Sequence, residues 1–122
     1  MKGIGWLDLT VDDAEGLRDF YARVMGWRPQ AVDMGEYSDF AMVDPETGEA
    51  AGGVCHARGG NADIPPVWLV YFQVTDLDGR LAAVREGGGT VLREPRLAGT
   101  SRYAIVRDPA GAVFALAEDA PR

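Results

Sequence analysis

The stretch "GWLDLTVDDAEGLRDFYARVMGW", residues 5–27, predicts a strand, a short turn and a helix. Polar and apolar residues alternate through residues 5–11, which is typical of a strand with one covered face. This alternation places Trp6, Asp8 and Thr10 on one side of the strand and Leu7, Leu9 and Val11 on the other.

A helix is predicted directly after the strand. Asp12 and Asp13 supply carboxylates that satisfy free amides at a helix start, and Gly26 has the backbone freedom that ends a helix. Apolar residues recur at helical spacing and are expected to pack on Leu7, Leu9 and Val11: Leu17, Phe20, Tyr21 and Val24.

The same pattern returns at "WLVYFQVTDLDGRLAAVREGGG", residues 68–89. Each copy precedes a hairpin, which turns at "DPETG" in the first half and at "DPAG" in the second. The sequence therefore predicts one domain made of two modules, at about residues 1–58 and 65–120. Each module has the order strand, helix and three strands.

Composition narrows the function classes. The 122 residues fit one domain, and no apolar run approaches the roughly 20 residues of a membrane helix. A net charge of -7 disfavours nucleic acid and anionic membranes as partners. The start of the chain lacks an apolar signal segment, so a cytoplasmic protein is expected. Cys55 is the only cysteine, which excludes an internal disulfide.

The segments "DLTVDDAEGLRDFYARVMGW", "VYFQVTDLDGRLAAVREGGG" and "RDPAGAVFALAE" together resemble the vicinal oxygen chelate superfamily, the group of glyoxalases, bleomycin resistance proteins and extradiol dioxygenases. The resemblance implies an α+β fold, in which two tandem βαβββ modules form curved mixed sheets that enclose a cavity. In the family, this cavity holds either a divalent metal or an organic ligand.

The resemblance also implies where metal ligands would stand. Counting from the helix-opening aspartates and from the "DPAG" turn, the family positions fall on Trp6, Leu69 and Ala115, with the fourth at about Gly52. None of these side chains coordinates a divalent metal, which takes imidazole nitrogen or carboxylate oxygen. We therefore expect no metal site and no cofactor.

Residues of the same strand parity are expected to face the cavity: Trp6, Asp8, Thr10, Tyr71, Gln73 and His56. Asp8 needs a donor there, such as His56, Tyr71 or Arg102, and both a structural hydrogen bond and a ligand contact fit it. The aromatic residues Trp6, Trp68, Tyr71 and Tyr103 could form an apolar box for a ligand, although core packing explains them too, above all Trp68.

His56 could act as a base, although a lone histidine is more often a plain surface or core residue. Cys55 has the opposite parity to His56 and is interpreted as an inert buried thiol. Arg58, Arg93, Arg96 and Arg102 could receive an anionic group or form a solvated rim.

Two functions remain. The first is a metal-independent protein that binds a small organic ligand in the cavity, through Trp6, Asp8, His56, Tyr71, Gln73 and Tyr103. The second is a glyoxalase-like lyase or isomerase, or a dioxygenase-like enzyme, with Asp8 and His56 as acid and base or as atypical metal ligands. A homodimer is expected, because pairing removes exposed strand edges and family members of this size commonly pair.

Overall fold

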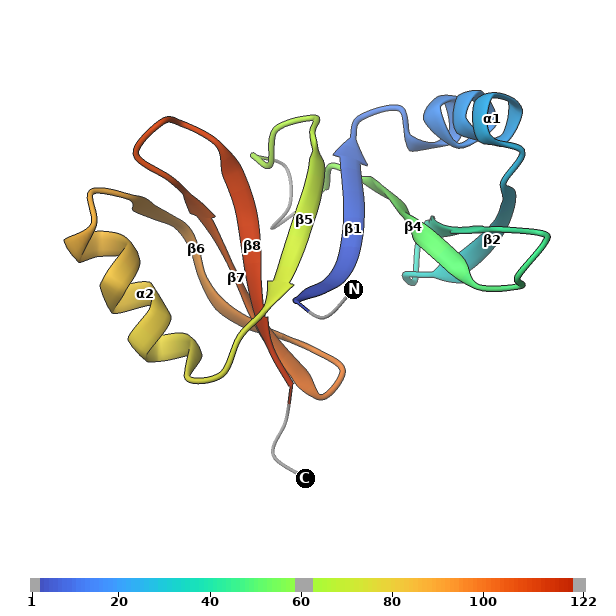
Figure 1. Cartoon of the computed structure of the whole chain (residues 1–122). Coiled ribbons are helices and arrows are strands. Elements are labelled where there is room, and N and C mark those ends of the chain that lie inside the picture. The colour runs from blue at the N-terminus through green and yellow to red at the C-terminus, as the bar shows by residue number, and fades with distance from the viewer. Residues whose placement is uncertain (1–2, 59–62, 120–122) are drawn as a thin grey trace. The chain divides into compact units, whose positions relative to one another are not determined.

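The structure, a computed structural model, describes residues 3–58 and 63–119. Two copies of one motif follow each other along the chain (Figure 1). The first comprises β1 (Ile4–Val11), α1 (Ala14–Met25), β2 (Arg28–Asp33), β3 (Ser38–Val43) and β4 (Ala50–His56). The second comprises β5 (Trp68–Gln73), α2 (Leu77–Glu86), β6 (Thr90–Ala98), β7 (Ser101–Arg107) and β8 (Val113–Glu118). The predicted α+β fold with two βαβββ modules is confirmed.

The chain divides into two compact units. The N-terminal unit is Leu7–Trp68, and the C-terminal unit joins Met1–Trp6 to Leu69–Arg122, so that β1 contributes to both. The strand order is β2-β3-β4-β1 in the first module and β5-β8-β7-β6 in the second. In each module the first and last strands pair in parallel and the hairpin strands pair antiparallel. The predicted module limits stay a prediction, and residues 1–2 and 120 lie outside the described residues.

In the N-terminal unit, α1 covers one side of the sheet. The Asp13 side chain accepts a hydrogen bond from the Gly16 amide at 3.0 Å, and Gly26 ends the helix at φ 69°. The buried cluster under the helix is Ala14, Phe40, Met42 and Val54, with Val11, Leu17, Tyr21, Ala22, Trp27 and Trp68 packed around it.

The predicted apolar side of α1 is partly wrong. Leu17 and Tyr21 pack inward, whereas Phe20 is 54% and Val24 59% exposed. The helix turns Ala14 and Ala22 toward the sheet together with Leu17 and Tyr21. The ring of Tyr21 packs against those of Trp27 and Trp68. The indole of Trp68 donates to the Tyr21 hydroxyl at 3.1 Å, so Trp68 belongs to this core.

In the C-terminal unit, α2 buries Leu77 and Leu81 against one side of the sheet. The sheet contributes Ala104, Val106 and Leu116 to the same cluster. Asp76 accepts a hydrogen bond from the Gly79 amide at 3.2 Å, and Glu118 accepts one from the Leu77 amide. These contacts satisfy amides at the helix start that have no partner within the helix.

Candidate functional site

The face of the N-terminal sheet that is turned away from α1 carries polar residues. Val54 faces α1, and strand register pairs Asp8 with Gly53 and Thr10 with Cys55. Since side chains alternate along a strand, Asp8, Thr10 and Cys55 lie on the opposite side from Val54. The predicted side of β1 for Asp8 and Thr10 thus agrees with the register.

Asp39 on β3 contacts both Cys55, on the polar face, and His56, at the end of β4. The regular pairing of β3 with β4 ends at Phe40 and Val54, and the carboxylate of Asp39 accepts the next hydrogen bond, from the His56 amide at 2.9 Å. The same oxygen lies 3.3 Å from His56 Nδ1. The side chains of Asp39 and His56 are only 11% and 14% exposed. This carboxylate therefore holds both the backbone and the ring of His56.

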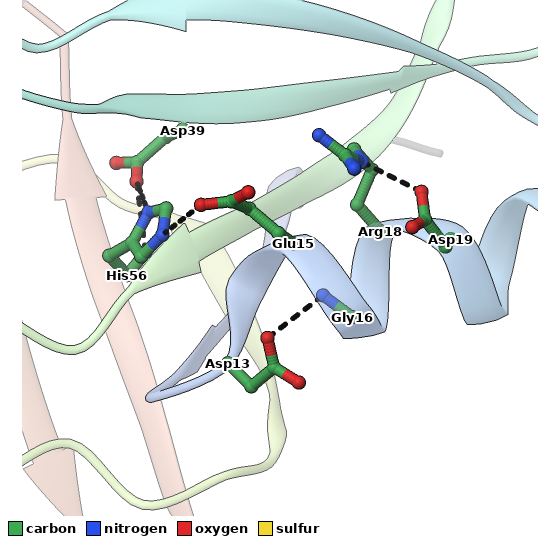
Figure 2. Close-up of polar contacts among 7 residues, drawn as sticks. All are labelled: Asp13, Glu15, Gly16, Arg18, Asp19, Asp39 and His56. Atoms are coloured by element: carbon green, nitrogen blue, oxygen red, sulfur yellow. Dashed lines mark hydrogen bonds and ion pairs between the residues drawn. The ribbon is translucent and has the colours of Figure 1, made fainter.

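Figure 2 shows the imidazole of His56 between the carboxylates of Asp39 and Glu15. Its Nε2 lies 3.9 Å from Glu15 Oε1, at the start of α1. An imidazole whose Nδ1–H is held by a carboxylate presents Nε2 as its basic atom. The two carboxylates fix the orientation of the imidazole, which is the geometric requirement for an acid or base.

The prediction that Asp8 and His56 lie on the same side of the sheet is wrong. His56 pairs in register with Val11 and therefore lies on the α1 side of the sheet, whereas Asp8 lies on the other side. Because side chains alternate along β4, Gly52, Val54 and His56 share a face, and α1 covers that face. The partner of His56 is Asp39, which was missed. The sequence does contain a signal for Asp39: like Asp8 in "WLDLTV", it is a carboxylate within an apolar strand, "SDFAMV", and therefore needs a hydrogen-bond partner.

Cys55 is held as a neutral thiol. Burial first, and then the charges of Asp8 and Asp39 with a hydrogen bond to Asp39, raise the pKa of Cys55 far above its ordinary value. A thiolate is the nucleophilic form, so this side chain is inert near neutral pH. This agrees with the interpretation of Cys55 as an inert thiol, and its side chain is partly buried.

The C-terminal unit carries an aromatic pair on the face turned away from α2. Register sets Tyr71 opposite Ala115 and Tyr103 opposite Ala117, alternating with Leu116 of the α2 cluster. The rings of Tyr71 and Tyr103 lie 5.8 Å apart between centroids, which is within the range of favourable aromatic pairs. Gln73 follows on the same side of β5, and the side chain of Arg93, 9% exposed overall, shares this face through its pairing with Ile105.

The remaining arginines have separate roles. Arg102 binds Asp78 at 3.1 Å and approaches Glu118 at 3.6 Å near the start of α2. It is thus a structural contact of α2. Arg58 stacks over the ring of Tyr37 at 4.2 Å, and Tyr37 lies 5.3 Å from the His56 ring. Arg96 is exposed.

The positions that the family resemblance associates with metal need one correction. Ala115 pairs with Tyr71, and the corresponding pair in the first module is Gly53 with Asp8, so the first-module position is Gly53 and not Gly52. Among residues 3–58 and 63–119, no group of three or more His, Cys, Asp or Glu side chains is placed to hold a metal ion. Neither helix of this part of the chain is long and apolar enough to cross a membrane.

Comparison with known proteins places this geometry in a family. The model of the Glyoxalase/Bleomycin resistance protein/Dioxygenase superfamily matches residues 3–116. The chain is 29% identical over 118 residues to the glyoxylase-like protein CFP32 of Mycobacterium tuberculosis, and 31% identical over 123 residues to the anthracycline biosynthesis protein DnrV of Streptomyces peucetius. These alignments cover 96% and 91% of this chain but only 44% and 45% of the relatives, so the chain spans less than half of their length.

Solved structures share the fold at lower identity. The Streptomyces coelicolor methylmalonyl-CoA epimerase in complex with 2-nitronate-propionyl-CoA superposes with a TM-score of 0.60 at 21% identity, over 99% of both chains. The Mn(II)-bound glyoxalase from Novosphingobium aromaticivorans gives 0.62 at 20% identity, over 99% of this chain and 41% of that one. The repeated βαβββ order and the family match over residues 3–116 show that the chain belongs to the Glyoxalase/Bleomycin resistance protein/Dioxygenase superfamily.

Proposed function

We propose that this protein binds a small organic molecule against the face of the C-terminal sheet that is turned away from α2. The single observation that carries the proposal is the Tyr71 and Tyr103 pair, with ring centroids 5.8 Å apart. Their cross-strand partners on β8, Ala115 and Ala117, have small side chains, and both tyrosines are only partly buried. A flat or aromatic group of a ligand can stack on such rings.

A second aromatic pair shows why the face matters. Phe72 and Phe114 have centroids 5.7 Å apart, which is nearly the same spacing. Phe114 packs against the cluster under α2, and Phe72 pairs in register with Leu116 of that cluster. Phe72 is 40% exposed, so this pair lies at the margin of the α2 cluster, on the opposite face of the sheet from the tyrosines. It is therefore a matched aromatic control for the tyrosine face.

Family membership supports a small organic ligand. The structural neighbours include methylmalonyl-CoA epimerases whose structures hold methylmalonyl-CoA or 2-nitronate-propionyl-CoA. Trp6, Asp8, Gln73 and His56 stay predicted ligand contacts, and the cavity between the modules stays a prediction implied by the family. Arg93 is a further candidate contact of the tyrosine face, and a guanidinium there would favour an anionic group on the ligand.

We propose further that binding is independent of a metal. Trp6, Gly53, Leu69 and Ala115 stand at the positions where the family resemblance places ligands, and none of these side chains offers an imidazole, a carboxylate or a thiolate. The proposal rests on the chemistry of these four side chains.

The second candidate function is proton transfer within a glyoxalase-like or dioxygenase-like reaction. The observation that favours it is the contact of His56 Nδ1 with Asp39 at 3.3 Å, which orients Nε2 as a base. In this candidate, Asp39 replaces Asp8 as the partner of His56. A reaction that depends on it would be lost in His56→Gln, while ligand binding at the tyrosine face would be kept.

The test is a thermal-shift screen of small aromatic and acyl compounds, repeated with Tyr103→Ala and with Phe72→Ala. We expect compounds that raise the melting temperature of the wild-type protein to lose at least about tenfold in affinity in Tyr103→Ala, as expected when one stacked aromatic contact is removed. Phe72→Ala lowers the melting temperature itself but keeps the affinity. Equal affinity in wild type and Tyr103→Ala for every hit would overturn the proposal.

A further inference from the structure

We propose a second ligand site in this protein, under the C-terminal half of α2, which takes a small apolar molecule that carries one negative group. The site is a pocket of about 370 Å³ within the C-terminal unit, between α2 and the hairpin of β7 and β8. Its apolar lining comprises Val74, Ala83, Val84, Pro109, Phe114 and Leu116. It lies on the α2 side of the sheet, opposite to the face of Tyr71 and Tyr103.

The sequence of α2 leaves this space unfilled. Leu77 and Leu81, in the first half of the helix, are 0% and 2% exposed and fill the interface with the sheet. The following half offers only the short side chains of Ala83 and Val84, so the sheet residues below them are not reached by a large side chain. A large apolar residue at position 83 would supply the missing volume.

Gly89 holds one end of the pocket in place. A Cβ at this position would lie 2.8 Å from the Arg107 carbonyl oxygen and 2.8 Å from Val84 Cγ1. Only glycine therefore permits the chain leaving α2 to approach the end of β7 so closely. Two hydrogen bonds fix the same end of the pocket: the Gly87 amide donates to the Ala83 carbonyl, and the Gly89 amide donates to the Val84 carbonyl.

The charges around the pocket favour an anion. Arg80 and Arg107 line it together with one acidic residue, Asp108. Asp108 is engaged by its own turn, because its Oδ1 accepts from the amides of Ala110 at 2.8 Å and Ala112 at 3.0 Å. Arg80 donates to the Thr75 carbonyl at 3.3 Å, and within residues 3–58 and 63–119 no carboxylate forms an ion pair with either arginine.

Two arginines beside an apolar pocket define the ligand class. Ligand pockets of about 300–1,000 Å³ are lined mainly by apolar side chains, with a few polar groups that orient the ligand. Here the apolar lining would bury a compact hydrocarbon body, and the guanidinium groups would bind a carboxylate at its end. The chain as a whole has a net charge of -7 and would repel an anion. The attraction would come from the two arginines at the edge of this pocket.

The experiment titrates the full chain with adamantane-1-carboxylate, with binding followed by amide shifts in NMR spectra. This probe is compact, apolar and anionic, and it has no aromatic ring to stack on Tyr71 or Tyr103. Adamantane-1-methanol is the uncharged control. We expect saturable shifts at the amides of Ala83, Val84 and Phe114, and at least about fivefold weaker binding of the alcohol, because the charge-assisted contact is lost.

Two pairs of variants complete the test. Ala83→Trp is expected to fill the pocket and abolish binding, whereas Ala82→Trp keeps it, because both alanines are exposed but only Ala83 lines the pocket. The double variant Arg80→Gln with Arg107→Gln keeps the pocket but removes the preference for the carboxylate, and Arg96→Gln serves as its control. Unchanged binding in Ala83→Trp, equal affinity for acid and alcohol, or no saturable shift would each overturn the proposal. Because Tyr103→Ala leaves this pocket intact, failure here is distinguishable from failure of the tyrosine face.

Discussion

Replacing Asp39 by alanine tests the contact that organises the end of β4. In the native chain, the Asp39 carboxylate accepts from the His56 amide at 2.9 Å, lies 3.3 Å from His56 Nδ1, and accepts a hydrogen bond from Cys55. Its side chain is 11% exposed, so water replaces it poorly. Asp39→Ala leaves the amide of His56 without its acceptor in a largely buried place.

The magnitude follows from these contacts. A buried donor left without a partner costs about 1–3 kcal/mol, and the lost contacts of a charged acceptor are of similar size. Since the contacts share one carboxylate, we expect a total loss of about 2–3 kcal/mol and not their sum. With a urea dependence of roughly 1–3 kcal/mol per M, the midpoint of unfolding would fall by about 0.7–3 M. Asp39→Asn keeps an oxygen in the same place and should recover about half of the loss.

The assay is urea unfolding at pH 7, followed by the fluorescence of the tryptophans. Trp27 and Trp68 lie in the core of the same unit and report its packing. The matched control is Asp33→Ala, which removes an exposed carboxylate that accepts from the Gly35 amide at 2.8 Å. An Asp39→Ala midpoint no lower than that of Asp33→Ala would refute the assignment of Asp39 as the group that holds His56.

Three further predictions concern Cys55, metal content and assembly. Burial and the charges of Asp8 and Asp39 raise the pKa of Cys55. The neutral thiol therefore contributes its full stabilisation of the folded chain below the ordinary thiol pKa of 9.0, and this stabilisation is lost as the pH rises above 9.0. Unfolding experiments from pH 8 to pH 11 should therefore show a steeper loss of stability in wild type than in Cys55→Ala, by up to about 1.4 kcal/mol per pH unit, and parallel curves would contradict this. Protein purified without chelator should contain no stoichiometric zinc, nickel, iron or manganese by elemental analysis, and one equivalent of any of them would be the opposite result. Light scattering should give twice the 13.1-kDa chain mass, because β2 and β6 end their sheets with edges that pairing can cover, whereas a monomer mass throughout the micromolar range would count against the dimer.

Much of the fold could be predicted because local signals agree with the final packing. Asp13 and Asp76 cap the two helices, Gly26 ends the first, and Gly48 and Gly111 take positive φ values in the two hairpin turns. Each of these depends on a few neighbouring residues. A single sequence contains such information directly.

The misses come from contacts between distant residues. No periodicity marks β2, whose residues "RPQAVD" are mostly exposed at the edge of their sheet, and it pairs only because β3 lies beside it. β6 runs from Thr90 to Ala98 through register shifts near Arg93 and Arg96, which no local pattern in its sequence indicates. Alternation alone can group Gly52, Val54 and His56 on one face, but only the packed helix decides which face that is.

The same limit applies to the candidate site. Tyr71 and Gln73 were predicted to share a side of their strand, and Tyr103 was predicted only as a member of an aromatic box. The register with Ala115 and Ala117 places all three on one face. Asp39 could not be paired with His56 from the sequence, since they stand 17 residues apart on strands whose register was unknown. The roles of all these residues in ligand binding remain predictions.

The most direct test of the central claim is a crystal structure of the protein soaked with the compound that gives the largest thermal shift. The account predicts electron density for the compound against the rings of Tyr71 and Tyr103, on the face of the C-terminal sheet turned away from α2. Density for the compound elsewhere, with both tyrosine rings left without a ligand contact, would contradict the account.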